Sequence, residues 1–290
     1  MGSPGLSVLE VMLLHGEERD MRKFFLLLFV TVLVPTLARS QSSGNFTYGT
    51  SGNTTNCQLS SKTGAIIGGA ECSTNSLGGV TFTCTTDADC TSILGSNSGA
   101  TCNTALGQCI FPTPQTNCGG NFYAGIKTSS GNGNVFVIRP SMVIGLLTDV
   151  TLSSKQLTTT GTVSSSALSG VDVTVTVGKE GGGTVNTVPN FGVTYDARFV
   201  QISTNLFAGL SANCTSATNG CFISFAESTV SAHSFDWLVT NLSAGNYGIT
   251  VNWGSTVAGT GIFESLTCVG PVNVTVQQNK IFSQNSVNSL

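Results

Sequence analysis

The residues that could carry out acid–base or nucleophilic chemistry in this chain are few and poorly grouped. His233 lies three positions before Asp236. In a β-strand, residues three apart point to opposite faces, which is the wrong arrangement for a His–Asp relay. The chain has no G-x-S-x-G nucleophile elbow, and nothing singles out two acidic residues as a glycosidase pair. We therefore expect no catalytic residue and no enzyme activity.

Metal and cofactor sites are also weakly supported. No C-x2-C pair occurs, and His233 is the only histidine after residue 40, so a zinc site lacks ligands. The run Gly181–Gly183 leads into Thr-Val-Asn-Thr-Val rather than a helix, which argues against a phosphate-binding loop. Asp87 and Asp89 are either calcium ligands or acids that cap a turn through backbone hydrogen bonds, and we favour the cap. We expect no cofactor.

Sugar binding is harder to dismiss, because carbohydrate sites use exposed aromatic rings with polar side chains around them. The aromatic residues available for this are Phe191, Tyr195, Trp237, Tyr247 and Trp253. Trp237, Tyr247 and Trp253 fall in predicted strands, where a core position is the commoner outcome. Trp253 runs into Gly254–Thr256, a predicted loop tip. Trp253 is therefore the one residue that we name as a predicted exposed contact.

All ten cysteines follow residue 40, and an even number in an exported chain predicts five disulfides. Seven lie between residues 57 and 118, in a segment too poor in apolar residues to fold without crosslinks. Cys214 and Cys221 are predicted to pair, because Asn219–Gly220 can turn the chain between them. Cys268 then pairs with one of the seven, most simply Cys118. The remaining members of the predicted set are Cys57, Cys72, Cys84, Cys90, Cys102 and Cys109.

Four of these cysteines follow a C-x5-C-x11-C-x6-C spacing, from Cys84 to Cys109. This run resembles the small knotted modules found in many secreted proteins. The resemblance implies that alternate cysteines pair, Cys84 with Cys102 and Cys90 with Cys109.

Strands are expected to position these residues from Asn121 onward. The clearest is Val171–Val177, where four valines share one face and Asp172, Thr174 and Thr176 the other. Further strands are predicted over Val135–Ile138, Met142–Leu146, Phe222–Phe225, Phe235–Val239, Tyr247–Trp253 and Val272–Val276. A glycine turn is predicted at Gly181–Gly183. One helix is predicted, over Asp196–Leu210, where Phe199, Ile202, Leu206 and Leu210 are near helical spacing.

The run Asn241–Val251 has a leucine, a glycine turn and then Tyr247 opening an alternating strand. It resembles the E-to-F corner of immunoglobulin-like sandwiches, which implies that the Tyr247 hydroxyl bonds to backbone near Asn241–Ala244. The longer stretch Ser231–Trp253 is similar to uncharacterised secreted proteins of fungi and related microbes. That second resemblance implies no function.

The fold class that follows is mostly β: an antiparallel immunoglobulin-like β-sandwich over residues 119–285, preceded by a small cysteine-rich disulfide module over residues 41–118. The alternative is one continuous β-rich domain that carries the cysteine region as an embellishment.

The start of the chain predicts export. Met21–Lys23 is basic, residues 24–37 form an apolar run too short to span a bilayer, and Ala38–Ser40 is a typical cleavage region. Residues 1–20 contain four acidic residues and look like an unused upstream extension, so residues 21–40 are the predicted signal peptide. N-terminal sequencing of secreted protein is expected to begin at Gln41, and an exported chain that retains residues 1–20 would contradict this.

Ten acidic and seven basic residues follow residue 40, with no basic cluster. That composition excludes a basic surface for binding nucleic acid and a polybasic patch for binding a membrane. No membrane span is expected in the mature chain. Five sequons occur, close to the roughly six expected by chance, and they are the possible glycosylation sites: Asn45, Asn53, Asn213, Asn241 and Asn273. We expect a secreted, non-catalytic structural or interaction protein of a cell surface, wall or extracellular matrix. The alternative is a secreted carbohydrate-binding protein, so the expected partners are surface polysaccharide or other extracellular proteins.

Overall fold

The computed structural model describes residues 45–50, 56–60, 65–129, 133–156, 164–203 and 220–280. These ranges belong to one compact unit that spans Asn45–Leu290. The signal peptide, Cys214 and the sequons at Asn53 and Asn213 lie outside the described residues. The elements are, in chain order, β1 (Phe46–Thr50), β2 (Gln58–Leu59), β3 (Ile66–Ile67), β4 (Ala70–Leu77), α2 (Asp87–Leu94), β5 (Thr101–Asn103), β6 (Gln108–Ile110), β7 (Gly119–Thr128), β8 (Asn134–Ser153), β9 (Ser164–Lys179), β10 (Thr184–Val185), β11 (Val193–Ser203), β12 (Phe222–Ser234), β13 (Trp237–Leu242), β14 (Gly245–Thr260) and β15 (Ile262–Lys280).

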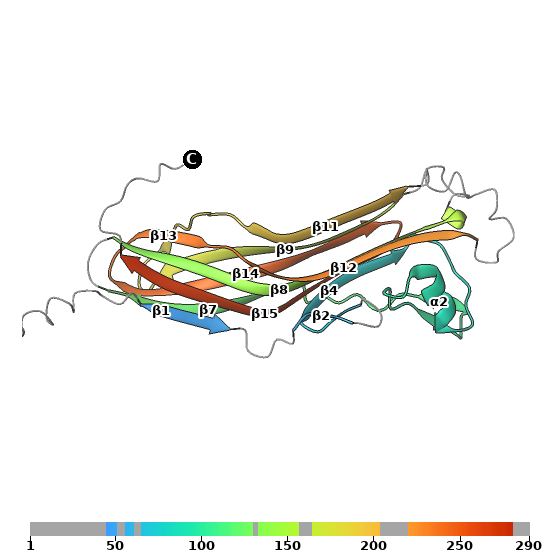
Figure 1. Cartoon of the computed structure of the whole chain (residues 1–290), viewed down its shortest axis with the longest axis horizontal. Helices are drawn as coiled ribbons and strands as arrows, with labels where there is room; N and C mark the ends of the chain where they lie inside the picture. The colour runs from blue at the N-terminus through green and yellow to red at the C-terminus, as the bar shows by residue number, and fades with distance from the viewer. Residues whose placement is uncertain are drawn as a thin grey trace, which may run out of the picture. The chain divides into compact units, whose positions relative to one another are not determined.

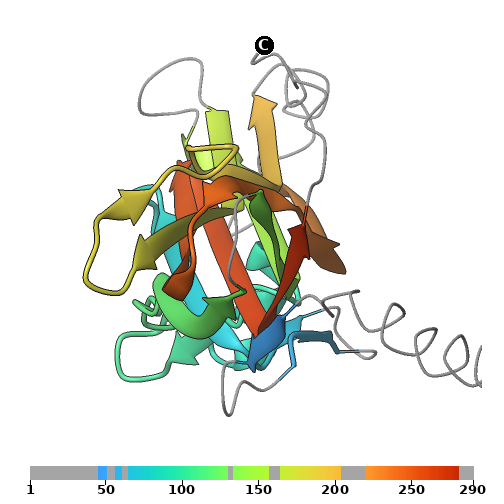
Figure 2. The ribbon, with the colours of Figure 1, turned by 90° about the vertical axis from the view of Figure 1, so that its left-hand side faces the viewer.

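Two antiparallel sheets form the body of the molecule, as the sequence predicts. The six-stranded sheet has the order β1-β15-β8-β12, with β13 also paired to β8 and β4 to β15. The five-stranded sheet has the order β10-β9-β14-β7, with β11 also paired to β9. Figure 1 shows β1 and β4 lying along successive stretches of β15, and Figure 2 looks along the strands of both sheets. The fold is therefore a mostly-β antiparallel sandwich.

The main core lies between the two sheets because strands such as β7, β9 and β14 alternate buried apolar residues with more exposed ones. On β9, Val171, Val173, Val175 and Val177 are buried, while Asp172, Thr174 and Thr176 are exposed. The same alternation on β7 and β14 buries one face of each strand and leaves the other to solvent. The outer face of the five-stranded sheet is consequently polar and accessible.

The cysteine-rich segment is divided between the sandwich and a small core of its own. Its strand β4 is an integral member of the six-stranded sheet. The rest surrounds a second apolar cluster, which consists of Phe82, Cys84, Cys90, Ile93, Leu94, Ala100, Cys109 and Ile262. Ile262 comes from β15, so the small core continues onto the outer face of the six-stranded sheet. The implied Cys84–Cys102 and Cys90–Cys109 disulfides are both present.

The prediction that Cys268 pairs with Cys118 is wrong. Cys268 is bonded to Cys57, and Cys118 is bonded to Cys72, so Cys57 and Cys72 are not partners either. The reason is the register of β4 on β15, which places Cys72 opposite Thr267. Adjacent residues of a strand point to opposite faces, so Cys72 and Cys268 lie on different faces of the same sheet. Cys221 is disulfide-bonded, but its predicted partner Cys214 lies outside the described residues.

The helix predicted over Asp196–Leu210 is also wrong where the structure describes it. Val193–Ser203 is the strand β11, paired with β9 from Val193–Val173 to Ser203–Ser164. Val200 and Ile202 alternate with exposed neighbours and pack against an inner apolar cluster. The helical spacing of apolar residues was a coincidence that long-range strand pairing overrides. Elsewhere, no helix of the described residues is long and apolar enough to cross a membrane.

Candidate functional site

The acid–base residues singled out in the sequence each contact a different residue near the surface. Asp236 accepts two hydrogen bonds from the Arg139 guanidinium, at 2.6 and 2.7 Å, which hold the pKa of Asp236 below its ordinary value. His233 instead faces Asp196, with 3.4 Å between His233 Nε2 and Asp196 Oδ2. Ser231 Oγ lies 2.6 Å from the same nitrogen. A catalytic triad needs its serine and its acid on different ring nitrogens, so this cluster does not have relay geometry.

Asp89 caps the start of α2, whereas Asp87 bonds to the backbone of strand β5. Asp89 accepts hydrogen bonds from the backbone N–H groups of Thr85 and Thr86, at 2.8 and 2.9 Å, and from the Thr85 hydroxyl. These bonds lower the pKa of Asp89 to about 2. Asp87 accepts a bond from the backbone N–H of Cys102. Both carboxylates are therefore engaged by backbone N–H groups of the protein itself, and Asp89 forms the predicted cap.

The aromatic residues named as sugar contacts have different environments. Trp237 is fully buried, Tyr195 and Tyr247 are buried, and Phe191 is exposed. Trp253 is half-buried and packs against the main core. Its indole also covers Gly120 on the neighbouring strand, where an added Cβ would lie 2.8 Å from the ring. Tyr123, which the sequence analysis did not select, is 66% exposed and offers more free ring surface than Trp253.

A row of glycines crosses the outer face of the five-stranded sheet close to Tyr123. Gly248 on β14 lies directly opposite Gly125 on β7 and directly opposite Gly178 on β9. Gly178 in turn lies opposite Thr184 on β10, which closes the row. Three neighbouring strands therefore lack side chains at the same level. The result is a groove across the strands, with a volume of about 750 Å³, which we call the glycine groove.

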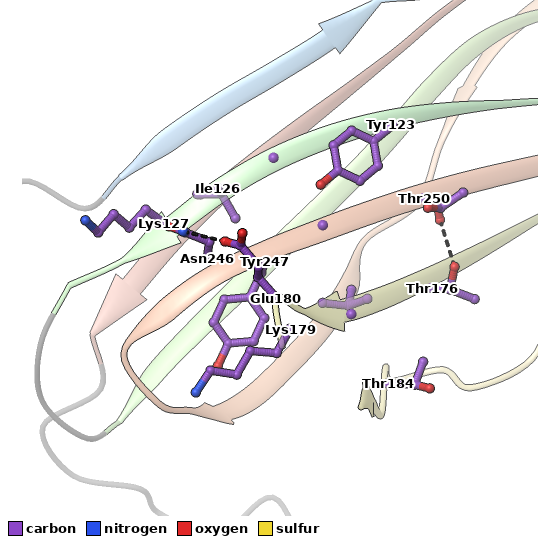
Figure 3. A pocket seen from close by; sticks show the side chains of 14 residues that line it. Tyr123, Ile126, Lys127, Thr176, Lys179, Glu180, Thr184, Asn246, Tyr247 and Thr250 are labelled. Atoms are coloured by element: carbon purple, nitrogen blue, oxygen red, sulfur yellow. Dashed lines mark hydrogen bonds between the residues drawn. The ribbon is translucent and has the colours of Figure 1, made fainter. Parts of the chain in front are cut away.

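The first wall of the glycine groove consists of three residues that are paired across neighbouring strands, each two positions from the glycine on its own strand. It consists of Tyr123, Thr250 and Thr176, where Thr250 lies opposite both other residues. The threonine hydroxyls provide donors and acceptors, and Thr176 Oγ1 donates to the Thr250 carbonyl at 3.4 Å. Figure 3 shows these side chains on one side of the groove.

The second wall lies two residues from the glycines in the other direction. It consists of Lys127 on β7, Asn246 on β14 and Glu180, the residue that follows β9. Asn246 Nδ2 donates to Glu180 Oε2 at 2.6 Å, as Figure 3 shows. The wall thus carries one cation, one amide and one anion, so its formal charges cancel. The two walls are four residues apart along each strand, which is about 13 Å between their Cα atoms.

The Tyr123 ring extends over the floor of the groove. A Cβ added at Gly248 would lie 2.6 Å from the Tyr123 ring, and one at Gly125 would lie 3.8 Å from it. A Cβ at Gly178 would meet nothing within 4 Å. The groove therefore has an accessible aromatic ring above β14 and an open floor above β9. This open floor is bordered by the ring and by polar side chains, and it is the most accessible candidate position for a ligand.

Sequence reasoning missed this site because its residues come from three separate segments. Each glycine lies at an outward position of an alternating strand, where a glycine interrupts the side-chain layer. That feature is visible in the printed sequence around Gly125, Gly178 and Gly248. Their alignment in one row depends on the register between the strands, which cannot be read from any one segment of the sequence.

Comparisons with known proteins add no family to this description. No protein-family model matches the chain, and no curated protein matches it. Among solved structures, it has weak similarity to dimeric latent PorU from Porphyromonas gingivalis, at 8% identity and a TM-score of 0.16, over 79% of this chain and 14% of that one. Eiger TNF from S. frugiperda is 8% identical with a TM-score of 0.13, over 56% of this chain and 67% of that one. The KI polyomavirus VP1 pentamer is 9% identical with a TM-score of 0.15, over 84% and 97%. The chain spans only a small part of PorU, and similarities of this size carry no argument about function.

Proposed function

We propose that this chain is a secreted, non-catalytic interaction protein of a cell surface, wall or matrix, and that it binds polysaccharide through the glycine groove. The observation that carries the proposal is the open, side-chain-free floor beside the exposed Tyr123 ring. An accessible aromatic ring can stack on the apolar face of a sugar. The hydroxyls of Thr176 and Thr250 and the amide of Asn246 can exchange hydrogen bonds with sugar hydroxyls.

The position of the groove favours a carbohydrate over an extended peptide. A peptide gains most of its affinity by adding a strand to a sheet edge, where backbone groups are unpaired. The glycine groove crosses β7, β14 and β9, of which β14 is paired on both sides. A ligand there meets few free backbone groups and must be recognised by side chains. Lys127 and Glu180 offset each other, and Lys179, which also lines the groove, donates to the Ser243 hydroxyl, so the lining has a formal charge of only +1.

The disulfides support the proposed compartment. Four are present among the described residues, and Cys221 belongs to another. Such density is typical of proteins that fold in an oxidising compartment outside the cytosol. The sequon residues Asn45, Asn241 and Asn273 are exposed at the described surface. Their glycosylation stays a prediction.

Two substitutions test the groove. Tyr123→Ala is expected to weaken retention on polysaccharide about 3- to 10-fold, because an aromatic contact contributes roughly 0.5–1.5 kcal/mol. Gly178→Val is expected to abolish retention, because a branched side chain would fill the open floor. Neither is expected to change the free energy of unfolding by more than about 0.5 kcal/mol, since both positions are on the solvent face. Retention is measured by co-sedimentation with cellulose, chitin and cross-linked mannan, and stability by thermal melting.

The matched control is Thr174→Val, which adds the same side chain to the same face of β9 outside the groove. It should retain wild-type binding. If the wild-type protein is retained on none of the polymers, the carbohydrate proposal fails, and a purely structural role is favoured. If Gly178→Val binds as well as the wild type, the polymer binds elsewhere on the molecule.

A further inference from the structure

Two buried carboxyl groups lie directly opposite each other in the six-stranded sheet. Asp149 on β8 is 2% exposed, and Glu264 on β15 is 4% exposed. They are register partners, so their side chains leave the same face of the sheet with Cβ atoms about 5 Å apart. The residues that flank the pair at this level are Ala226 on β12 and Asn75 on β4, and both are uncharged. No cation from these neighbouring strands faces the pair.

The cysteine-rich segment covers this pair from outside the sheet. An added Cβ at Gly95, which ends α2, would lie 2.7 Å from Asp149 Oδ2, so only a glycine allows this close approach. Gly95 opens a turn that Ser98 closes by donating its N–H and its hydroxyl to the Gly95 carbonyl. Asn97 lies inside the same turn. The charged groups of α2, Asp87 and Asp89, are both acidic and bonded to backbone N–H groups.

Three of the four carboxylate oxygens of this pair have no hydrogen-bond donor. Among the described residues, both oxygens of Asp149, Oε2 of Glu264 and Oδ1 of Asn97 are buried without a hydrogen-bond partner. Buried unpaired polar groups are rare in folded proteins, and each unpaired carboxylate oxygen is costly. Here three of them belong to the two facing carboxylates and the fourth, Asn97 Oδ1, belongs to the turn that covers Asp149; all four are acceptors. A set of acceptors without donors has the ligand chemistry that a hard divalent cation requires.

The protonation of the pair depends on this environment. Burial raises the pKa of Asp149 from 3.8 to about 7. Burial, and then the charge of Asp149, raises the pKa of Glu264 from 4.5 to about 8. The folded protein therefore binds protons here more tightly than the unfolded chain does. The stabilisation that these protons provide is complete below pH 4 and is lost as the pH rises through about 7 to 8.

We propose that Asp149 and Glu264 bind a calcium-type divalent cation at the junction between the six-stranded sheet and the turn Gly95–Ser98. The cation neutralises the two carboxylates and links the cysteine-rich segment to the sandwich. Calcium fits better than magnesium because it accepts irregular oxygen geometry and loses its water more readily. This proposal is independent of the glycine groove.

The experiment measures the melting temperature of the secreted protein at pH 8 after chelation, with and without added CaCl2 or MgCl2. Calcium is expected to raise the melting temperature by about 5–10 °C at roughly 100 times its dissociation constant, and magnesium by less. At pH 5 the rise should be small, because protons compete for the same oxygens. In chelator, the melting temperature should fall between pH 5 and pH 8.

Asp149→Asn/Glu264→Gln is the test variant, and Glu71→Gln on β4 is the matched control. The double variant should lose the calcium response and, in chelator at pH 8, should melt at or above the wild-type temperature, because the buried charges are gone. Glu71→Gln should respond like the wild type. Equilibrium dialysis of the wild-type protein with radioactive calcium should find about one ion per chain at pH 8, and this measurement does not depend on the variants folding.

Two results would overturn the proposal. A melting temperature that falls with pH but ignores calcium, with no ion bound in dialysis, would mean that the pair holds protons alone. An equal calcium response in the wild-type protein and both variants would place the ion at another site.

Discussion

Removing the Cys57–Cys268 disulfide by alanine substitution of both cysteines is expected to lower the free energy of unfolding by about 5 kcal/mol. The two residues are 211 positions apart, so the disulfide closes the longest loop of the four described ones. Crosslinking a long loop removes more conformational entropy from the unfolded chain than crosslinking a short one. Both cysteines are also fully buried in a cluster with Ile66 and Leu147, which would lose contacts. Urea denaturation of the folded, oxidised proteins measures the difference.

The comparison variant replaces Cys84 and Cys102, which are only 18 positions apart. Its expected loss is smaller, about 3 kcal/mol, because the loop is shorter. A Cys57→Ala/Cys268→Ala protein as stable as the wild type would contradict the expectation. So would peptide mapping that found Cys268 joined to another cysteine.

Tyr247→Ala is expected to cost about 3–5 kcal/mol of unfolding free energy, because it leaves a cavity in the main core. Tyr247 is 3% exposed, and its ring meets Phe136 edge-on at a centroid distance of 5.4 Å. Its hydroxyl donates to the Ser243 carbonyl at 2.9 Å, which confirms the corner that the sequence resemblance implies. Tyr247→Phe removes this bond and the longer one of 3.4 Å to the Ser243 hydroxyl, and it should cost roughly 1–3 kcal/mol.

Thermal and urea melts of the two Tyr247 variants are compared with Tyr123→Ala, an aromatic truncation on the neighbouring strand at an exposed position. Tyr123→Ala should melt like the wild type and bind polysaccharide weakly. The Tyr247 variants should melt earlier than the wild type, and only their stability is compared, because Tyr247 also lines the glycine groove. A Tyr247→Ala protein with wild-type stability would remove the corner from the list of contacts that hold the sandwich together.

Patterns within one segment determined much of this fold. The alternation of Val171–Val177 identified a half-buried strand, because a period of two is readable without knowing the neighbouring strand. The Tyr247 corner and the Cys84–Cys102 and Cys90–Cys109 disulfides also involve residues that are close in the chain. Local spacing limits the possible partners in all these cases, so sequence motifs carry the information.

Only the tertiary structure decided the features that depend on strand register between distant segments. Gly125 and Gly248 meet across a separation of more than a hundred residues, and so do Asp149 and Glu264. A shift of one residue in either pairing would reverse which side chains face the solvent, the core or the cysteine-rich segment. The Cys57–Cys268 disulfide and the strand β11 have the same origin, since both depend on which strands pair. Register is set by the sum of contacts over a whole sheet, so no single segment of the sequence specifies it.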